Sequence, residues 1–355
     1  MFSLDYFMSL TSSWEFFKNT ELPIFIYGMG DGCLKLTKQL SGIGVSETGI
    51  FASDEFVRGH SFLGHKVKTL AEVESEYEEF AVALAFGAGY PSLMEKIDNI
   101  SKKHKLIVPD TAVVGGEPFT KSYLSKRFSD AKKVYDMLYD DFSKLVYENI
   151  IAYKITGDIE FLRKITTEPE EAYENILRLP KDVAAVDLGA YNGDTIREML
   201  EFTGGSYKKI FAVEPNGRNF RKLSEYAEGM ENVTLVNAAG WSFSGEITFS
   251  KGGGRMAKAS EKGVLTPCVS VDDLLCGEKA DYIKYDVEGA EKEALSGSEN
   301  TIKSFSPRLC VALYHRLEDI IDIPLQVCEM NPDYKFFIRH YPYYPAWETN
   351  LFCTK

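Results

Sequence analysis

The stretch VAAVDLGAYNGDT, residues 183–195, constrains the fold of this chain more than any other. Its apolar start leads to Asp187, and the chain then turns through Gly189 and Gly193. The apolar run predicts a buried parallel strand, and Thr195 opens an amphipathic helix. Strand, glycine turn and helix in this order form the first unit of a doubly wound α/β sheet, whose ligands bind beyond the carboxyl ends of the strands. The turn is therefore a candidate cofactor site.

Carboxylates in this turn narrow the choice of cofactor. Dinucleotide-binding turns bring a pyrophosphate against backbone N–H groups at a helix start, whereas Asp187 and Asp194 would repel phosphates. They favour a ligand with an amine and a sulfonium, such as S-adenosylmethionine. A second predicted strand, 210–213, ends in Glu214-Pro215-Asn216, where a carboxylate can accept hydrogen bonds from both ribose hydroxyls. The residues thus predict an S-adenosylmethionine site at two neighbouring strand ends.

Four motifs in roughly the last half of the chain resemble, in order and spacing, those of the FkbM family of S-adenosylmethionine-dependent methyltransferases. They are DLGAYNGDT, VEPN, VNAAGWSFSGEITF and YIKYDVEGAE. The resemblance implies that Glu214 binds the ribose, and that Asn237 and Ala238 lie at the adenine. We add Thr195 and Asn216, in the two turns, to the expected cofactor site. The residues that the resemblance places at the methionine end are Asp187, Gly189, Asn192, Gly193 and Asp194.

The expected fold is α/β in three parts. Residues 181–355 are predicted to form a seven-stranded Rossmann-like methyltransferase sheet, with its last strand antiparallel. Residues 119–180 have long helical periodicity and predict a helical bridge. Residues 1–118 predict a leading helix and a smaller Rossmann-like domain. The glycine-rich polar segment 251–263 predicts a mobile loop within the C-terminal part.

The predicted N-terminal domain carries a weak dinucleotide fingerprint. Gly28 and Gly30 supply its first two glycines, but Cys33 stands at the third position. Asp54 lies near the end of the next strand, roughly where a ribose-binding carboxylate is expected. The domain resembles small Rossmann-like domains that precede some sugar-modifying transferases. It either binds a nucleotide or sugar nucleotide, or is a scaffold that orients the acceptor or mediates dimerisation.

Polar residues after the later strands are the candidates for chemistry. We expect Asp286, Glu288 and His315 to be catalytic, with His315 as the general base and Asp286 orienting it. The alternative for His315 is a neutral imidazole that satisfies a strand end. Asp286 with His315 could also hold a divalent ion, but the ligand set is incomplete, so no metal is expected. The expected substrate-binding residues are Tyr314, Arg316, Arg339 and His340.

The loop that follows His340, YPYYPAW, is rich in aromatic residues. Its rings could stack on sugar faces, or the loop could be a hydrophobic plug. Arg339 and His340 could equally pair with surface acids.

Composition excludes some partners. The chain has 40 Lys and Arg against 53 Asp and Glu, a net charge of −13, which argues against nucleic acid and anionic membrane surfaces. Six cysteines without a C-x-x-C pair indicate reduced thiols. No run approaches the ~18 apolar residues of a membrane span. We therefore expect a cytoplasmic protein, which could form a homo-oligomer.

These features predict an S-adenosylmethionine-dependent O-methyltransferase. Its acceptor is expected to be a hydroxyl of a sugar or other polyhydroxylated small molecule, a glycan included. One alternative is an NAD-dependent oxidoreductase of a nucleotide-linked sugar, with Gly28 and Gly30 as its fingerprint. The other is a non-catalytic protein that binds a glycan precursor.

Overall fold

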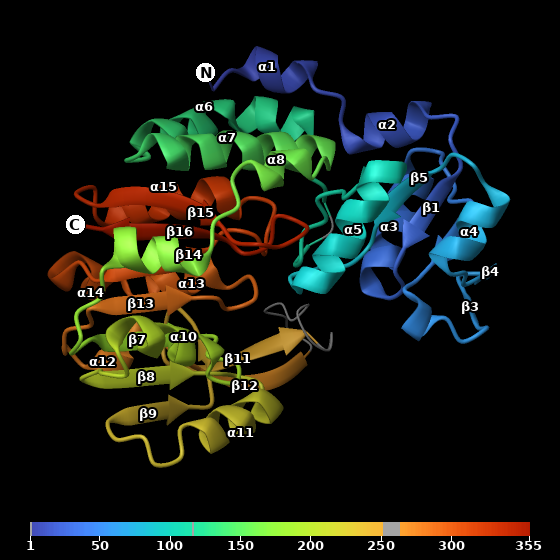
Figure 1. Ribbon diagram of the computed structural model, residues 1–355. Coiled ribbons are helices and arrows are strands. Elements are labelled where there is room, and N and C mark those ends of the chain that lie inside the picture. The colour runs from blue at the N-terminus through green and yellow to red at the C-terminus, as the bar shows by residue number, and fades with distance from the viewer. Residues whose placement is uncertain (1, 116, 251–262) are drawn as a thin grey trace.

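The structure is a computed structural model that describes residues 2–115, 117–250 and 263–355. The glycine-rich segment predicted to be mobile lies, except for Gly263, outside the described residues. Figure 1 shows two sheets side by side, with a layer of helices above the C-terminal one. The helices that the structure describes include none long and apolar enough to cross a lipid bilayer.

The C-terminal part contains the predicted seven-stranded sheet, with strand order β15-β16-β14-β13-β7-β8-β9. Strand β16 is antiparallel to both of its neighbours, and the other pairs are parallel. The prediction of the fold class is confirmed. The strands are β7 (Ala184–Leu188), β8 (Lys209–Val213), β9 (Val233–Val236), β13 (Tyr282–Tyr285), β14 (Arg308–Ala312), β15 (Lys335–His340) and β16 (Thr349–Thr354).

Alternation of side chains along these strands gives the sheet two buried faces. Ala185, Ile210 and Tyr282 pack on one face with α10 (Asp194–Thr203) and α11 (Gly217–Tyr226). Val186, Phe211 and Ile283 face the other side. The helices on that side are α12 (Val271–Leu275), α13 (Glu291–Ser296), α14 (Glu299–Phe305) and α15 (Asp319–Met330).

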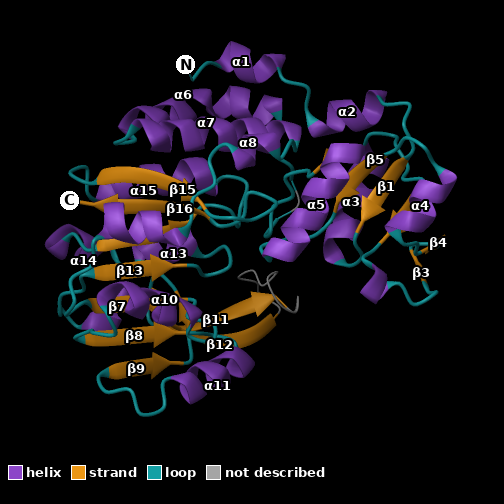
Figure 2. Ribbon diagram, in the orientation of Figure 1, coloured by secondary structure: helices purple, strands orange, loops and turns teal. Residues whose placement is uncertain are grey.

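A small ribbon extends from this sheet toward the N-terminal part (Figure 2). It consists of β10 (Ala239–Gly240), β11 (Gly245–Ser250) and β12 (Gly263–Val269), in the order β10-β12-β11.

The N-terminal sheet is parallel, with strand order β2-β1-β5-β6. The chain adds β2 on one side of β1 and then crosses back to add β5 on the other side. The order in which strands are added therefore reverses between β1 and β5. The strands are β1 (Ile24–Tyr27), β2 (Gly49–Phe51), β5 (Ala81–Leu84) and β6 (Lys105–Ile107). A hairpin pairs β3 (Ser61–Phe62) with β4 (His65–Lys66). The helices are α1 (Leu4–Ser9), α2 (Ser13–Asn19), α3 (Asp31–Gly42), α4 (Leu70–Glu76) and α5 (Pro91–Lys103), with a 3₁₀ turn at Asp54–Phe56.

The helical region that follows the N-terminal sheet along the chain packs on the edge of the C-terminal sheet. Its main helices are α6 (Lys121–Met137) and α7 (Asp141–Thr156), followed by α8 (Glu160–Arg163), α9 (Pro169–Glu171) and a π-helical turn (Ala172–Leu177). Tyr139 N–H donates to the carbonyl of Phe336 in β15 at 2.8 Å. One hydrophobic cluster joins both sheets to these helices.

Candidate active site

The turn after β7 is built on two glycines with positive φ, Gly189 at 86° and Gly193 at 85°. Gly193 precedes the first residue of α10, Asp194, whose carboxylate accepts from Thr195 N–H at 2.9 Å. A Cβ on Gly189 would lie 1.8 Å from the carbonyl oxygen of Asp286. The turn therefore lies directly against the carboxyl end of β13, where the catalytic candidates begin.

Asp187 is buried at the end of β7. Neither of its carboxylate oxygens has a hydrogen-bond partner among the described residues. Burial raises the pKa of Asp187 to about 7, against the attraction of Lys284. A buried carboxyl group without a partner costs folding free energy, so this group is suited to meet a ligand that donates hydrogen bonds.

Glu214 lies at the end of β8 and is also buried. Its carboxylate accepts from the N–H groups of Tyr191 at 3.0 Å and Asn216 at 2.8 Å. Burial raises its pKa despite these hydrogen bonds. A carboxylate offers about four lone-pair sites, so the group can accept a further hydrogen bond from a ligand hydroxyl.

Three further cofactor candidates shape the neighbouring turns. The Asn216 side chain caps α11 by accepting from the N–H groups of Arg218 and Asn219. Asn237 Nδ2 donates to the Glu214 carbonyl at 2.7 Å, and Ala238 is buried beside it. Asn216 and Asn237 thus hold the backbone around Glu214, and their contact with a cofactor stays a prediction.

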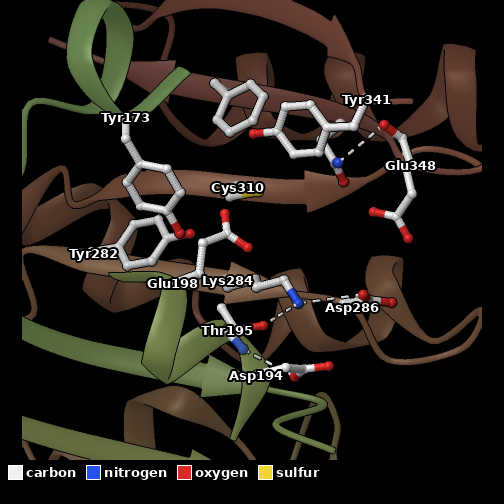
Figure 3. A pocket seen from close by; sticks show the side chains of 12 residues that line it. Tyr173, Asp194, Thr195, Glu198, Tyr282, Lys284, Asp286, Cys310, Tyr341 and Glu348 are labelled. Atoms are coloured by element: carbon white, nitrogen blue, oxygen red, sulfur yellow. Dashed lines mark hydrogen bonds and ion pairs between the residues drawn. The ribbon is translucent and has the colours of Figure 1, made fainter. Parts of the chain in front are cut away.

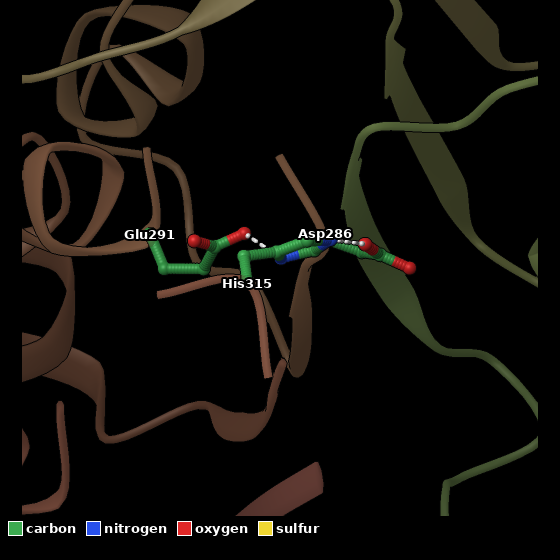
Figure 4. A group of neighbouring side chains, drawn as sticks. All are labelled: Asp286, Glu291 and His315. Atoms are coloured by element: carbon green, nitrogen blue, oxygen red, sulfur yellow. Dashed lines mark ion pairs between the residues drawn. The ribbon is translucent and has the colours of Figure 1, made fainter. Parts of the chain in front are cut away.

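His315, Asp286 and Glu288 lie together, as the sequence predicted. His315 Nε2 is 3.6 Å from Asp286 Oδ1 and 3.7 Å from Glu288 Oε2. On the other side of the ring, Nδ1 is 2.9 Å from Glu291 Oε1 (Figure 4). Glu291 is buried, and it anchors the turn by accepting from the N–H groups of Val287 and Gly289.

These carboxylates change the expected role of His315. Although its own burial opposes the charge, Glu291, Asp286 and Glu288 raise the pKa of His315 to about 9. The ring therefore carries a proton at neutral pH and cannot accept another. A base at His315 stays a prediction, and the structure adds what the sequence did not show, three carboxylates around one imidazole.

The charge on His315 should appear in the pH dependence of stability. Its pKa is higher in the folded protein, about 9, than its ordinary 6.5, so its stabilisation is complete below pH 6.5 and is lost as the pH rises through 9. We expect His315→Gln to lower the free energy of unfolding by about 3 kcal/mol more at pH 6 than at pH 9.5. Urea unfolding at both pH values measures this. An equal loss at both would contradict a charged His315.

Lys284 is a site residue that was not among the candidates predicted from the sequence. It lies on β13 in register with Asp187 on β7. Its ammonium donates to Thr195 Oγ1 at 2.8 Å and to Asp286 Oδ2 at 3.3 Å. Burial opposes the charge, but Asp286 and Asp187 raise the pKa of Lys284 well above its ordinary value. Asp286, held between Lys284 and His315, has a lowered pKa despite its burial.

A cavity of about 180 Å³ opens beside Lys284 and Asp286 (Figure 3). The segment between β15 and β16 contributes Tyr341 and Glu348 to its wall. Burial and the charge of Asp286 raise the pKa of Glu348 to about 7, although Lys284 and His315 oppose the shift. The other lining residues are Tyr173, Asp194, Thr195, Glu198, Tyr282, Cys310, Asn350 and Phe352. The cavity thus offers one carboxyl group that exchanges its proton near neutral pH.

The expected substrate residues separate into two groups. Tyr314 and Arg316 lie at the site: the Tyr314 hydroxyl is 3.4 Å from Asp286 Oδ1, and Arg316 Nε donates to the Gly289 carbonyl at 2.6 Å. Arg339 and His340 do not line the cavity.

Arg339 is buried under the helical region, where it donates to Glu171, Asp140 and Ser143. Its guanidinium therefore fastens β15 to these helices and is not available to a substrate. His340 is buried, with Nδ1 3.1 Å from Thr349 Oγ1, and burial lowers its pKa to about 3. It is a neutral side chain of the core. Both positions follow from the helices covering this strand, which periodicity alone does not show.

Comparisons with known proteins support the fold described above. The methyltransferase FkbM domain family matches residues 187–341. The crystal structure of methyltransferase FkbM from Methylobacillus flagellatus KT superposes with a TM-score of 0.71 at 17% identity, covering 94% of this chain and 90% of that one. It shows a shared overall fold.

Two other solved structures overlap with about half of the chain. Aeropyrum pernix fibrillarin in complex with natively bound S-adenosyl-L-methionine has a TM-score of 0.33 and 12% identity, covering 50% of this chain and 69% of that one. An rRNA methylase from Streptococcus thermophilus has a TM-score of 0.36 and 15% identity, covering 53% and 95%. Among curated protein sequences, none matches. Residues 187–341, within the C-terminal half of the chain, thus match a methyltransferase domain of the FkbM family, as the motifs of this half predicted.

Proposed function

We propose that the protein transfers a methyl group from S-adenosylmethionine to a hydroxyl of a sugar or other polyhydroxylated small molecule. The observation that carries the choice of cofactor is the buried Asp187 carboxyl without a partner, beside Glu214 and below a glycine turn. Carboxylates at these two strand ends suit an amine, a sulfonium and ribose hydroxyls, and they oppose a pyrophosphate. The family match favours this function over an NAD-dependent oxidoreductase.

The cofactor fits the residues around the turn. Glu214 would hold the ribose hydroxyls, and Asp187 with Asp194 would face the positively charged end. Bound there, S-adenosylmethionine supplies a methyl group that passes to the acceptor oxygen while the sulfur keeps the bonding electron pair. The protein contributes orientation, which can account for about 7–11 kcal/mol of the barrier when reacting atoms are held in line.

The acceptor hydroxyl must also lose its proton. We assign this proton to Glu348, whose pKa of about 7 suits a general base at neutral pH. Asp286 stays ionised between Lys284 and His315, so its carboxylate can accept a hydrogen bond from the hydroxyl and orient it. In this arrangement Lys284 and His315 hold Asp286 in place, and Glu348 takes up the proton.

The cofactor assignment predicts a loss of affinity in Glu214→Gln. The amide keeps the shape of the side chain but replaces one charged acceptor oxygen by a donor, so the hydrogen bonds to the ribose weaken. We expect the Kd for S-adenosylhomocysteine to rise about 10- to 100-fold, measured by titration calorimetry.

Glu228→Gln, an exposed change after α11, is the matched control and should bind normally. Unchanged affinity in Glu214→Gln, or a thermal shift with NAD and none with S-adenosylhomocysteine, would contradict the cofactor assignment.

A further inference from the structure

A second cavity, of about 550 Å³, lies at the carboxyl edge of the N-terminal sheet. The ends of β1, β5 and β6 form its floor, and the segment between β15 and β16 closes it. It therefore lies where the strand order reverses, the place at which doubly wound sheets bind ligands. Its volume is typical of small-molecule sites. The residues used below are Asp31, Lys35, Phe86, Thr111, Val113 and Trp347.

Two segments of the wall of this cavity continue into the methyl-transfer site. Trp347 lines the second cavity, and its neighbour Glu348 lines the first. Val113 lines the second cavity, and the next residue, Val114, donates its N–H to the His315 carbonyl at 2.8 Å. Since consecutive Cα atoms are only about 3.8 Å apart, the walls of the two cavities meet at Trp347 and Glu348. A ligand unit bound in the N-terminal cavity would therefore lie close to the segment that carries Glu348.

The chemistry of the second cavity favours an uncharged ligand. Lys35 is the one cation among the described residues that line it. Its ammonium is 3.0 Å from Asp31 and donates to the carbonyls of Ala112 at 3.3 Å and Val113 at 3.2 Å. An ammonium has three protons, and these three partners use them all. The Asp31 carboxylate would in addition repel a phosphate.

The remaining groups suit a carbohydrate. Phe86 and Trp347 are aromatic residues of the cavity wall, and the C–H face of a sugar ring can pack against such side chains. Contacts with Tyr27 and Tyr343 hold the two rings in place. Asp31 and Thr111 offer oxygens that accept hydrogen bonds from hydroxyls. The Asp31 side chain is 59% exposed, so its carboxylate is accessible to a ligand.

We propose that this cavity binds an uncharged saccharide unit of the methyl acceptor, next to the unit that is methylated. The proposal rests on the methyl transfer proposed above. It gives the N-terminal domain a specific task. A sugar unit held by Trp347 and Asp31 would place the next unit of the same oligosaccharide beside Glu348. The aromatic segment between β15 and β16 then serves both cavities.

The test measures transfer from tritiated S-adenosylmethionine to a fixed panel. Its uncharged members are maltotriose, cellotriose and chitotriose, and its charged members are UDP-glucose and NAD. At least one uncharged saccharide should be methylated, and Trp347→Ala and Asp31→Asn should each raise its KM about tenfold. Because Asp31 is exposed, Asp31→Asn tests the cavity even if Trp347→Ala disturbs the fold. Phe305→Ala, at the end of α14, is the control and should leave KM unchanged.

Failure of this proposal is distinct from failure of the proposed function. Calorimetric titration with S-adenosylhomocysteine tests the function alone, and its Kd should be the same in wild type and in all three variants. If that titration succeeds, the cavity proposal is overturned when only charged members are methylated. It is also overturned when no uncharged member is methylated, or when the KM for the methylated saccharide is unchanged in both cavity variants.

Discussion

Replacing Glu348 by Gln should lower kcat about 10²- to 10⁴-fold, the contribution of a positioned general base. Glu348 lines the cavity beside Asp286 and Lys284, and burial with the charge of Asp286 raises its pKa to about 7. In the wild type, kcat should therefore rise with pH through 7 as this carboxyl group loses its proton. The amide cannot accept the proton, so the variant should lack this rise. Steady-state rates from pH 5.5 to 8.5, with an acceptor that is methylated, measure both effects.

The alternative role for Glu348 is a contact with the cofactor. In that case Glu348→Gln would raise the Kd for S-adenosylhomocysteine, whereas a base would leave this Kd within about twofold. Glu329→Gln, an exposed change at the end of α15, controls for the loss of one negative charge. A normal kcat in Glu348→Gln, or a rise through pH 7 that persists in this variant, would remove Glu348 as the base.

Local patterns in the sequence were enough to predict the C-terminal sheet. Each of its strands is a short apolar run, and Asp187, Glu214 and Asp286 each stand at or just after the end of one. Because parallel strands bring their carboxyl ends to one edge, these positions also predicted that the acidic residues meet. The fold and the turn thus follow from properties that neighbouring residues carry.

Other site residues depend on contacts between distant segments. Lys284 had a detectable signal: it is two residues before Asp286 on a strand, so the two side chains share a face. Glu348 had none, because the segment between β15 and β16 reaches the cavity only in the folded chain. The protonation of His315 needed Glu291, which belongs to the following helix. Charge states therefore could not be predicted from strand ends alone.

Gly189→Ala, in the turn after β7, should strongly lower the stability of the fold. Gly189 has a φ of 86°, and a Cβ there would lie 1.8 Å from the Asp286 carbonyl oxygen. The positive φ alone costs an alanine about 1–2 kcal/mol. The contact adds to this cost because the Cβ is fixed to the backbone of Gly189 and its partner is a backbone carbonyl, so β7 and β13 must move apart. We expect Gly189→Ala to lower the free energy of unfolding by about 4 kcal/mol or more, measured by urea denaturation.

Gly204→Ala provides the matched control for that loss. Gly204 follows α10 with a φ of 67°, but a Cβ there would meet nothing within 4 Å. This variant therefore carries the backbone strain without the contact, and it should lose only about 1–2 kcal/mol. The difference between the two variants measures how closely the turn is packed against Asp286. Equal losses would show that the turn can relax away from β13. A stable Gly189→Ala protein that binds S-adenosylhomocysteine normally would show that cofactor binding does not depend on this close packing.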